Sequence, residues 1–216
     1  MNVLVTGASS GIGQATALEF INWGHKVIGI DVLPASMKHS NYTHVEADVS
    51  NMDELPTIKY VDILINNAGV QNNGRDIEVN LIGTMNCTKK YGIRPGIRAI
   101  VNVASTSGHT GAEFPEYAAS KGGVLAYTKH VAMEVAKFGA TCNSISPGGV
   151  VTPINQHILD DPELMSAVLK ETMLGKWASA KEIAQWIFFI AAVNTSMTGQ
   201  DIIIDNGETS KYNFIW

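Results

Sequence analysis

Residues 2–13 are Asn2-Val3-Leu4-Val5-Thr6-Gly7-Ala8-Ser9-Ser10-Gly11-Ile12-Gly13, and they set the architecture of this 216-residue chain. The aliphatic run before Thr6 predicts a buried strand, and the glycines after it predict a tight turn. A helical pattern runs from about Ile12 to Trp23 and stops at Gly24, the usual position for a helix-ending glycine. This succession is typical of an α/β domain. Because the strand begins so early, we expect no signal peptide.

Strand-like and helix-like segments continue to alternate along the rest of the chain. Further strands are predicted at Val27–Ile30, Thr43–Glu46, Val61–Ile65, Ala99–Val103, Thr141–Ser146 and Asp201–Ile204. Further helices are predicted at about 76–91, 116–137, 160–174 and 180–192. This alternation indicates an α/β fold with a doubly wound parallel sheet of about seven strands and helices on both faces. No linker or repeat interrupts it, so residues 1–216 are expected to form a single domain.

The glycine turn has the chemistry of a phosphate-binding loop. Its three glycines follow the spacing G-x-x-x-G-x-G and let the backbone approach a pyrophosphate, whose charge the helix N-terminus stabilises. A tight turn without a ligand is the simpler alternative, but the position directly after the first strand favours a dinucleotide. The expected cofactor contacts in this loop are Gly7, Ser9, Ser10, Gly11, Ile12 and Gly13.

Asp31 is the second part of this signal. It stands eighteen residues after Gly13, at the end of the second predicted strand, where a carboxylate can accept hydrogen bonds from an adenosine ribose. The same carboxylate repels a 2′-phosphate, and neither Ser10 nor Val32 offers a basic partner for one. A solvated aspartate at a strand end is the alternative. Together with the glycine loop, Asp31 favours NAD over NADP.

Tyr117 and Lys121 are separated by one helical turn, and Ser105 follows a predicted strand twelve residues before Tyr117. A free phenol is a poor base at pH 7, but a nearby ammonium would lower its pKa toward the working range. Tyr117 could then exchange a proton with a carbonyl or alcohol oxygen, and Ser105 could stabilise the charge on that oxygen. A surface pair on a helix is the alternative, which the accompanying cofactor motifs disfavour.

The motifs together resemble those of the short-chain dehydrogenase/reductase family, of the compact cytoplasmic type, over nearly the whole chain. They are, in order, Thr6-Gly7-x-x-x-Gly11-Ile12-Gly13, Asp48-Val49, Asn66-Asn67-Ala68-Gly69, Asn80, Ser105, Tyr117-x-x-x-Lys121, Pro147-Gly148 and Thr152. The resemblance implies a Rossmann fold and an enzyme that transfers hydride between NAD(H) and a secondary alcohol or carbonyl.

Individual roles are implied by the same resemblance. Asp48, followed by Val49, is similar to the residue that meets the adenine ring, and Asn80 to a catalytic asparagine that holds a proton-relaying water. Lys121 is also implied to hold the nicotinamide ribose. Further cofactor contacts are implied for Asn67, Ala68, Gly69, Tyr117, Pro147, Gly148, Val150 and Thr152.

The chain departs from the family pattern mainly between Gly69 and Asn80, which are eleven positions apart. Relatives usually carry a longer loop and helix there, and the stretch from Asp48 to Asn66 is also short. The segment 70–79 is polar and rich in turn residues. We expect one side of the cleft to be open there or closed by another subunit, and the role of Asn80 to rest on resemblance rather than spacing.

Composition excludes several classes of function. A net charge of −5 and a pI near 5.6 argue against a nucleic-acid partner. The longest apolar run, Ile183 to Val193, is about half of a membrane span. Cys87 and Cys142 lack metal-binding spacing, and the six histidines form no ligand pattern. We therefore expect a cytoplasmic protein without a metal or membrane partner.

The segment 153–177 is the expected substrate lid, with Leu164, Val168 and Leu169 at helical spacing. His109, Glu113, Phe114 and Glu116 are expected at the mouth of the pocket. A small apolar or hydroxylated carbonyl or alcohol is the expected substrate.

A homodimer or homotetramer is expected through the helices at 76–91 and 116–137. Their apolar residues lie on more than one side, for example Leu81, Met85, Val124, Tyr127, Val131 and Val135. The apolar tail 212–216 is expected to pack at an interface.

Two other functions compete with a general alcohol dehydrogenase or carbonyl reductase. A 3-oxoacyl-carrier-protein reductase has a similar pattern, but such enzymes usually prefer NADP, so Asp31 weighs against it. A non-catalytic dinucleotide sensor would be expected to have lost Ser105, Tyr117 or Lys121, and all three are present.

Overall fold

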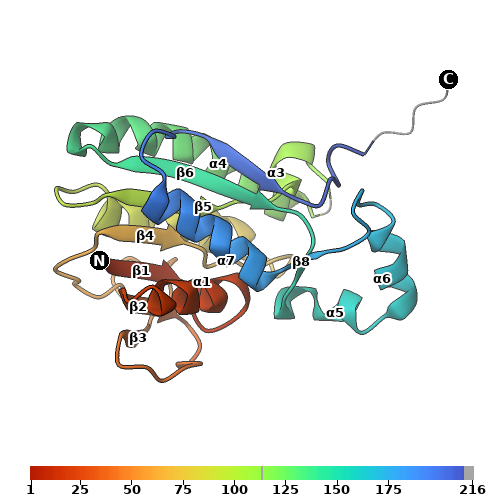
Figure 1. Cartoon of the computed structure of the whole chain (residues 1–216), viewed down its shortest axis with the longest axis horizontal. Helices are drawn as coiled ribbons and strands as arrows, with labels where there is room; N and C mark the ends of the chain where they lie inside the picture. The colour runs from red at the N-terminus through yellow and green to blue at the C-terminus, as the bar shows by residue number, and fades with distance from the viewer. Residues whose placement is uncertain (113, 212–216) are drawn as a thin grey trace.

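The computed structural model describes residues 1–112 and 114–211. Seven parallel strands form one sheet in the order β3-β2-β1-β4-β5-β6-β9 (Figure 1). They are β1 Asn2–Thr6, β2 Lys26–Asp31, β3 Tyr42–Glu46, β4 Ile63–Asn66, β5 Ala99–Val103, β6 Thr141–Pro147 and β9 Asp201–Ile204. The strand order reverses at β1, as expected of a doubly wound sheet, so the predicted fold class is confirmed. A separate pair joins β7 (Val150–Val151) to β8 (Ala178–Ser179).

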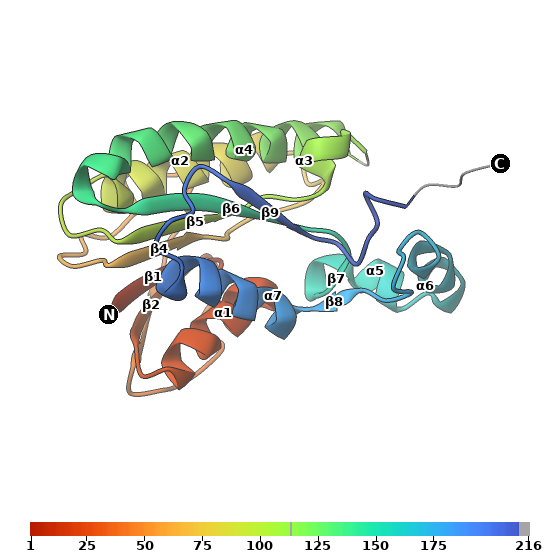
Figure 2. The ribbon, with the colours of Figure 1, turned by 45° about the horizontal axis from the view of Figure 1, so that its top comes forward.

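Helices cover both faces of the sheet (Figure 2). One face carries α1 (Gly11–Asn22) and α7 (Ala180–Phe188), which η5 (Phe189–Val193) extends. The other face carries α4 (Pro115–Val135) and a helix over residues 77–92, made of η1 (Ile77–Ile82), α2 (Gly83–Cys87) and η2 (Thr88–Gly92). The remaining helices are α3 (Ser107–Thr110), η3 (Ala136–Phe138), η4 (Pro153–Asn155), α5 (Gln156–Leu159) and α6 (Pro162–Leu169).

The central strands divide their side chains between two cores. Val3 and Val5 point into the core beside α1 and α7, whereas Leu4 points into the core beside α4. Ile63, Leu64 and Ile65 alternate in the same way. All these positions are buried, because successive side chains of a strand face opposite sides and helices cover both sides here. The continuous aliphatic runs of the sequence therefore correspond to strands without a polar face.

The strand and helix predictions hold except at some ends. The strand predicted at Val61–Ile65 begins at Ile63. The helix predicted over 160–174 is wrong in its length, because α6 ends at Leu169. Beyond it, the N–H groups of Met173 and Leu174 both donate to the carbonyl oxygen of Asn206, which draws the chain out of the helix. The apolar tail at 212–216 lies outside the described residues.

Three of the six apolar residues named as interface candidates lie in the core instead. Val124, Val131 and Val135 are all buried, and Val131 and Val135 belong to the core between α4 and the sheet. These three residues therefore do not form an exposed apolar side of the helix. Met85 is exposed, whereas Leu81 and Tyr127 are half-buried.

The connection from β3 to β4 has no helix. Side chains of the 77–92 helix and the residues after it hold this connection through its backbone carbonyls. The side-chain donors and carbonyl acceptors are Asn86 to Val49 and Ser50, Lys90 to Leu55, Tyr91 to Pro56 and Arg94 to Ile58. These hydrogen bonds take over the anchoring that a helix in this connection would provide.

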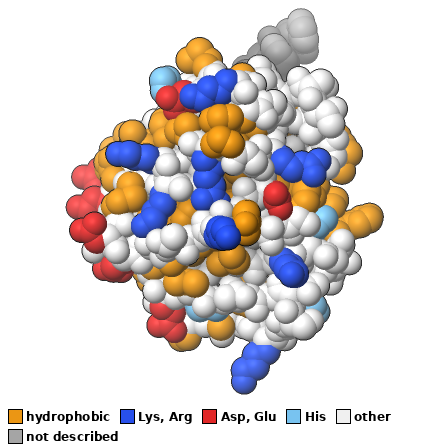
Figure 3. Space-filling model, turned by 90° about the vertical axis from the view of Figure 1, so that its left-hand side faces the viewer, with side chains coloured by type: hydrophobic (Ala, Val, Ile, Leu, Met, Phe, Trp, Pro, Cys, Tyr) orange, Lys and Arg blue, Asp and Glu red, His pale blue; other side chains and the backbone are white. Residues whose placement is uncertain are grey.

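The two ends of the sheet differ in character. Figure 3 shows the face at the amino ends of the strands, where Lys and Arg side chains are scattered singly among hydrophobic ones. The loops at the carboxyl ends are grouped near α5, α6 and β8 (Figure 1). Within the described part of the chain, no helix is long and apolar enough to cross a membrane.

Replacement of Tyr91 by Phe tests the anchoring of the β3–β4 connection. Tyr91 is 1% exposed and its hydroxyl donates to the Pro56 carbonyl oxygen at 2.7 Å. Loss of this bond should lower the free energy of unfolding by about 1 kcal/mol, measured by urea denaturation. Tyr60→Phe is the control, because Tyr60 is an exposed residue of the same connection. Equal stability of the two variants would contradict the anchoring role.

Candidate active site

A cavity of about 520 Å³ lies at the carboxyl ends of the strands. Loops that follow β1, β2, β3, β4, β5 and β6 all contribute to its wall, as expected for a binding site at the point where strand order reverses. The predicted residues that line it are Gly7, Ser10, Gly11, Ile12, Asp31, Asp48, Val49, Asn67, Ala68, Gly69, Ser105, Tyr117, Lys121, Pro147, Gly148, Val150 and Thr152. Three further predicted residues, Ser9, Gly13 and Asn80, lie outside this lining.

The glycine loop brings backbone rather than side chains to the cavity. Gly7 and Gly11 have φ of 67° and 52°, conformations that residues with a Cβ rarely adopt. A Cβ on Gly13 would overlap the carbonyl oxygen of Gly7, so the start of α1 packs directly on the turn. The amide of Asn67 donates to the carbonyls of Thr6 and Gly7 and fixes the turn from the neighbouring strand. The residues present fit the pyrophosphate of a dinucleotide.

Asp31 is fixed at the other side of this loop. One carboxylate oxygen accepts from the N–H of Ser9 at 2.9 Å, and the other accepts from the N–H of Leu33 at 2.9 Å. The side chain of Ser9 donates to the carbonyls of Leu33 and Pro34. It therefore fixes the loop after β2 and does not line the cavity. The bonds to Asp31 hold a negative charge where the adenosine ribose is expected.

Asp48 and Val49 follow β3 and form the next part of the wall. One oxygen of Asp48 accepts from the N–H and the hydroxyl of Ser50, and the other accepts from Arg75 at 3.0 Å. Desolvation opposes the ionised carboxylate, but the bonds from Ser50 and Arg75 outweigh it and lower the pKa of Asp48. Asp48 is therefore a fixed, ionised acceptor.

Ser105, Tyr117 and Lys121 converge from two elements. Ser105 follows β5 and is buried, and its hydroxyl donates to that of Ser107 at 3.4 Å. Tyr117 lies in the first turn of α4 and lines the same cavity as Ser105. The ammonium of Lys121 lies 5.7 Å from the centre of the Tyr117 ring. The predicted grouping of hydroxyl, phenol and ammonium is thus present in one cavity.

The ammonium of Lys121 is almost completely buried. The residue is 5% exposed, and its ammonium donates to the carbonyl oxygen of Val103, the last residue of β5, at 2.9 Å. Burial lowers the pKa of Lys121 to about 8, and the negative charge of Asp76 opposes part of that fall. At neutral pH the side chain is therefore mostly charged, with little water to screen its field.

Asn80 lies behind the cavity wall, in η1. Its side-chain oxygen accepts from the N–H of Val70, and its amide donates to the carbonyl of Val70 and to the hydroxyl of Ser120. A Cβ on Gly69 would lie 3.2 Å from the Asn80 oxygen and 3.5 Å from the Lys121 ammonium, so both groups approach the same backbone position. The side chain of Asn80 therefore holds the backbone of the segment after β4 in place.

The loop after β6 forms another part of the cavity wall. The hydroxyl of Thr152 donates to the carbonyl of Val150, and a Cβ on Gly11 would lie 3.3 Å from the Thr152 methyl group. The Trp177 ring covers Gly149 so closely that a Cβ there would overlap the indole. These contacts join the lid segment, the glycine loop and the loop after β6 in one wall.

Among the residues expected at the pocket mouth, Phe114 lines the cavity. His109 instead donates to or accepts from Ser146 and pairs with Asp201 at 2.8 Å, so it ties α3 to the sheet. Glu116 does not line the cavity, and Glu113 lies outside the described residues.

No individual role was predicted for Arg75, Asp76 or Trp177. The only signals for Arg75 and Asp76 were their polarity and their place in the short segment 70–79, and Trp177 was predicted only as the end of the lid segment 153–177. No group of three or more His, Cys, Asp or Glu residues that could hold a metal ion occurs in ranges 1–112 and 114–211.

Comparison with known sequences gives matches over nearly the whole chain. A family model described as Enoyl-(Acyl carrier protein) reductase matches residues 7–209. Glucose 1-dehydrogenase of Gluconobacter oxydans is 33% identical, over 96% of this chain and 91% of its own length. A 3-oxoacyl-(acyl-carrier-protein) reductase of Thermotoga maritima is also 33% identical, over 94% of this chain and 96% of its own length.

Comparison with solved structures gives the same fold. A 4-hydroxyisoleucine dehydrogenase complexed with NADH superimposes with a TM-score of 0.86 at 27% identity, covering 98% of this chain and 99% of that one. The protein ElxO with NADP bound has a TM-score of 0.85 at 27% identity, covering 97% and 99%. Similar structures therefore hold either nicotinamide dinucleotide.

The burial of Lys121 predicts a pH-dependent stability difference between Tyr117→Phe and Tyr117→Phe/Lys121→Met. The common Phe removes titration of Tyr117 from the comparison. Because the lysine pKa falls from 10.5 to about 8 on folding, the unfolded chain binds more protons between these values. The free energy of unfolding of Tyr117→Phe, minus that of Tyr117→Phe/Lys121→Met, should therefore rise by about 3 kcal/mol as the pH increases across this window. Urea denaturation at several pH values measures it, and a flat difference would contradict it.

Proposed function

Because the chain belongs to the short-chain dehydrogenase/reductase family, we propose that it is an NAD-dependent enzyme that interconverts a secondary alcohol and a carbonyl. The observation that carries the proposal is the convergence of Ser105, Tyr117 and Lys121 on a cavity that also contains the glycine loop. A nicotinamide dinucleotide supplies the hydride chemistry when it is bound. The protein positions the substrate and moves the proton.

Tyr117 is the proposed proton donor and acceptor. In reduction its hydroxyl gives a proton to the carbonyl oxygen, and in oxidation the phenolate takes the proton of the alcohol. Ser105 donates a hydrogen bond to the same oxygen and stabilises the charge that develops on it. The buried charge of Lys121 favours the phenolate, because opposite charges attract strongly where water is scarce. Asn80 supports this group by holding the segment beside Lys121. Asn80 is also the proposed holder of a water that relays protons to Lys121.

NAD is the proposed cofactor because of Asp31. Its carboxylate lines the cavity and is held by two backbone N–H groups, so it cannot readily turn away from a ribose. A 2′-phosphate placed there would meet a fixed negative charge. The remaining proposed contacts are Asp48, Val49, Ala68 and Gly69 for the adenosine, and Pro147, Gly148, Val150 and Thr152 for the nicotinamide.

The proposed substrate is a small molecule that enters beside the lid segment 153–177. Apolar residues of this region line the cavity near Tyr117, with some polar ones among them. In the lid segment they are Ile154, His157, Ile158, Val168, Glu171 and Trp177, and Phe114, just before α4, lines the same cavity. No residue of α6 is buried, which leaves this helix free of the core contacts that would fix its position.

A 3-oxoacyl-carrier-protein reductase is the alternative, because two of the relatives bear that name. The description of the family model, an enoyl-carrier-protein reductase, also names an acyl-carrier-protein substrate but a different reaction. Assays with small ketones, secondary alcohols, sugars and 3-oxoacyl thioesters, with NADH and NADPH, separate the alternatives. Preference for a thioester with NADPH would favour the alternative. Tight NADH binding without any turnover would favour a sensor.

A homodimer or homotetramer in the cytoplasm completes the proposal. Ile77, Ile82 and Met85 on the 77–92 helix and Met133 on α4 are exposed apolar residues. They support an interface through these two helices. The buried thiols of Cys87 and Cys142 are unpaired, as is usual in a reducing compartment.

Tyr117→Phe should lower kcat by about two to four orders of magnitude, because the hydroxyl that transfers the proton is lost. The Kd of NADH, measured by fluorescence titration, should stay within about twofold. Tyr127→Phe is the control, because Tyr127 lies on the same helix but not in the cavity wall. Retention of turnover by Tyr117→Phe would exclude Tyr117 as the acid and base.

Asp31→Asn should move the ratio of kcat/KM for NADH to that for NADPH at least about tenfold toward NADPH, because it removes a repulsive charge. Glu46→Gln provides the control. Glu46 pairs with Asp31 across β2 and β3 and is exposed, but it does not line the cavity. An equal shift in both variants would mean that general charge, and not the position of Asp31, sets the preference.

A further inference from the structure

Arg75 occupies an unusual place in the cavity wall. It belongs to the short polar segment between β4 and η1, where a longer connection was expected from the family. Its side chain lines the same end of the cavity as Asp31, Asp48 and Val49. The proposed function assigns this end to the adenosine, but it gives Arg75 no role.

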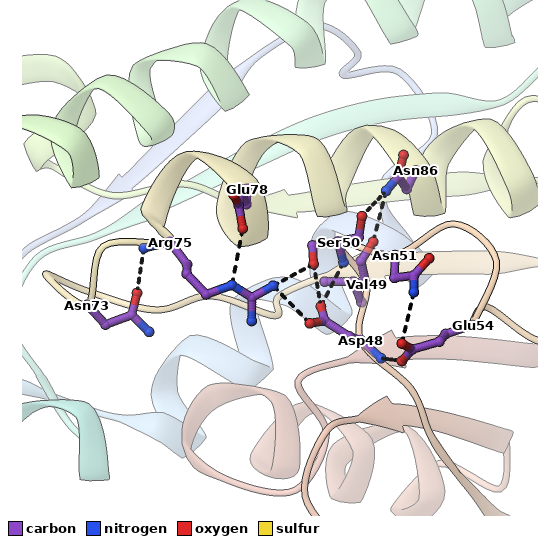
Figure 4. A network of polar contacts seen from close by, with 9 residues as sticks. All are labelled: Asp48, Val49, Ser50, Asn51, Glu54, Asn73, Arg75, Glu78 and Asn86. Carbon is purple, nitrogen blue, oxygen red and sulfur yellow. Dashed lines mark hydrogen bonds and ion pairs between the residues drawn. The ribbon is translucent and has the colours of Figure 1, made fainter.

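Arg75 bridges two connections that are 27 residues apart (Figure 4). One terminal nitrogen donates to Asp48 at 3.0 Å and to the hydroxyl of Ser50 at 2.8 Å, and Nε donates to Glu78 at 3.1 Å. The N–H of Arg75 also donates to the side chain of Asn73. Both the backbone and the guanidinium of Arg75 are therefore held in place.

The bonds leave one acceptor position of Asp48 open. Oδ1 already accepts two hydrogen bonds, both from Ser50, whereas Oδ2 accepts one, from Arg75. A carboxylate oxygen can accept two hydrogen bonds, so Oδ2 can take one more donor. Asp48 is about one fifth exposed and lines the cavity, so that donor can come from a ligand.

The charges around Arg75 disfavour binding of the 2′-phosphate that distinguishes NADP from NAD. Arg75 is paired with Asp48 and Glu78, and Asp31 lines the same cavity. Glu54 also accepts from the N–H of Asp48, so carboxylates outnumber the guanidinium at this end of the cavity. This end therefore suits a neutral ligand group that donates hydrogen bonds, which is the character of an adenine 6-amino group and not of a phosphate.

We propose that Arg75 is a specificity-determining positioning residue, which holds Oδ2 of Asp48 as a fixed acceptor for the 6-amino group of adenine. This inference rests on the proposed function, because it needs a dinucleotide in the cavity. An ion pair as exposed as this one contributes little to folding. The effect of Arg75 should therefore appear in binding and not in stability.

The test compares Arg75→Gln with Arg98→Gln in the full chain. Arg98 is an exposed arginine just before β5, at the end of the sheet away from the cavity, so it controls for loss of one positive charge. Kd values are measured by fluorescence titration with NADH, with NADPH and with reduced nicotinamide hypoxanthine dinucleotide, in which a carbonyl replaces the 6-amino group. Arg75→Gln should weaken NADH binding about tenfold and change binding of the hypoxanthine analogue by less than about twofold.

A double-mutant cycle completes the test. Because Arg75 acts through Asp48, Arg75→Gln in an Asp48→Asn background should have little further effect on NADH binding. Arg75→Lys should restore part of the affinity, because a single ammonium can still pair with Asp48 but not also orient toward Ser50 and Glu78. Thermal unfolding of each variant controls for damage to the fold.

Three results would overturn the role of Arg75. They are an unchanged Kd of NADH, an equal loss for NADH and the hypoxanthine analogue, and a loss confined to NADPH. The last would identify a phosphate contact instead. Failure of the proposed function looks different, since the unmodified protein would then bind neither dinucleotide or would bind without turning over any substrate.

Discussion

The buried ammonium of Lys121 is the interaction on which the site depends. A charged group that loses its water must find acceptors in the protein, and Lys121 finds the carbonyl of Val103 at the carboxyl end of β5. This bond fixes α4 against the sheet at one point of contact. Ser105 stands two residues beyond Val103, and Tyr117 stands one turn before Lys121. The need to solvate one charge therefore sets the relative positions of all three groups.

Much of the fold and the site could be predicted because both depend on local pattern and strand polarity. The alternation of strand-like and helix-like segments identified all seven strands of the main sheet, and residues that follow parallel strands necessarily meet at one edge. Ser105 and the glycine loop are of this kind. The end of α6 was missed because it depends on Asn206, a distant residue that binds the N–H groups of Met173 and Leu174. The pairing of Arg75 with Asp48 was missed for the same reason.

The absent helix between β3 and β4 explains why polar side chains of the 77–92 helix are arranged as they are. Tyr91 and Lys90 donate to carbonyls that would otherwise bond within a helix, and Asn86 does so twice. Such bonds fix a connection of irregular backbone at specific residues rather than along its length. Asn86 holds Val49 and Ser50 in this way, next to Asp48. The shortened connection therefore still presents Asp48 to the cavity at a defined position.

The segment from Gly69 to Asn80 links the two ends of the cavity. Asn80 holds Val70 beside Lys121 through two hydrogen bonds, and Arg75 reaches across to Asp48 at the end proposed for the adenosine. Asp76 lies between them, buried, with its oxygens accepting from the N–H groups of Asn72 and Asn73. A longer loop could move at one end without disturbing the other. Here the twelve residues 69–80 are held by Arg75 to Asp48, by Asp76 to the N–H groups of Asn72 and Asn73, and by Asn80 to Val70. The short segment is therefore fixed along its length and not only where it leaves β4.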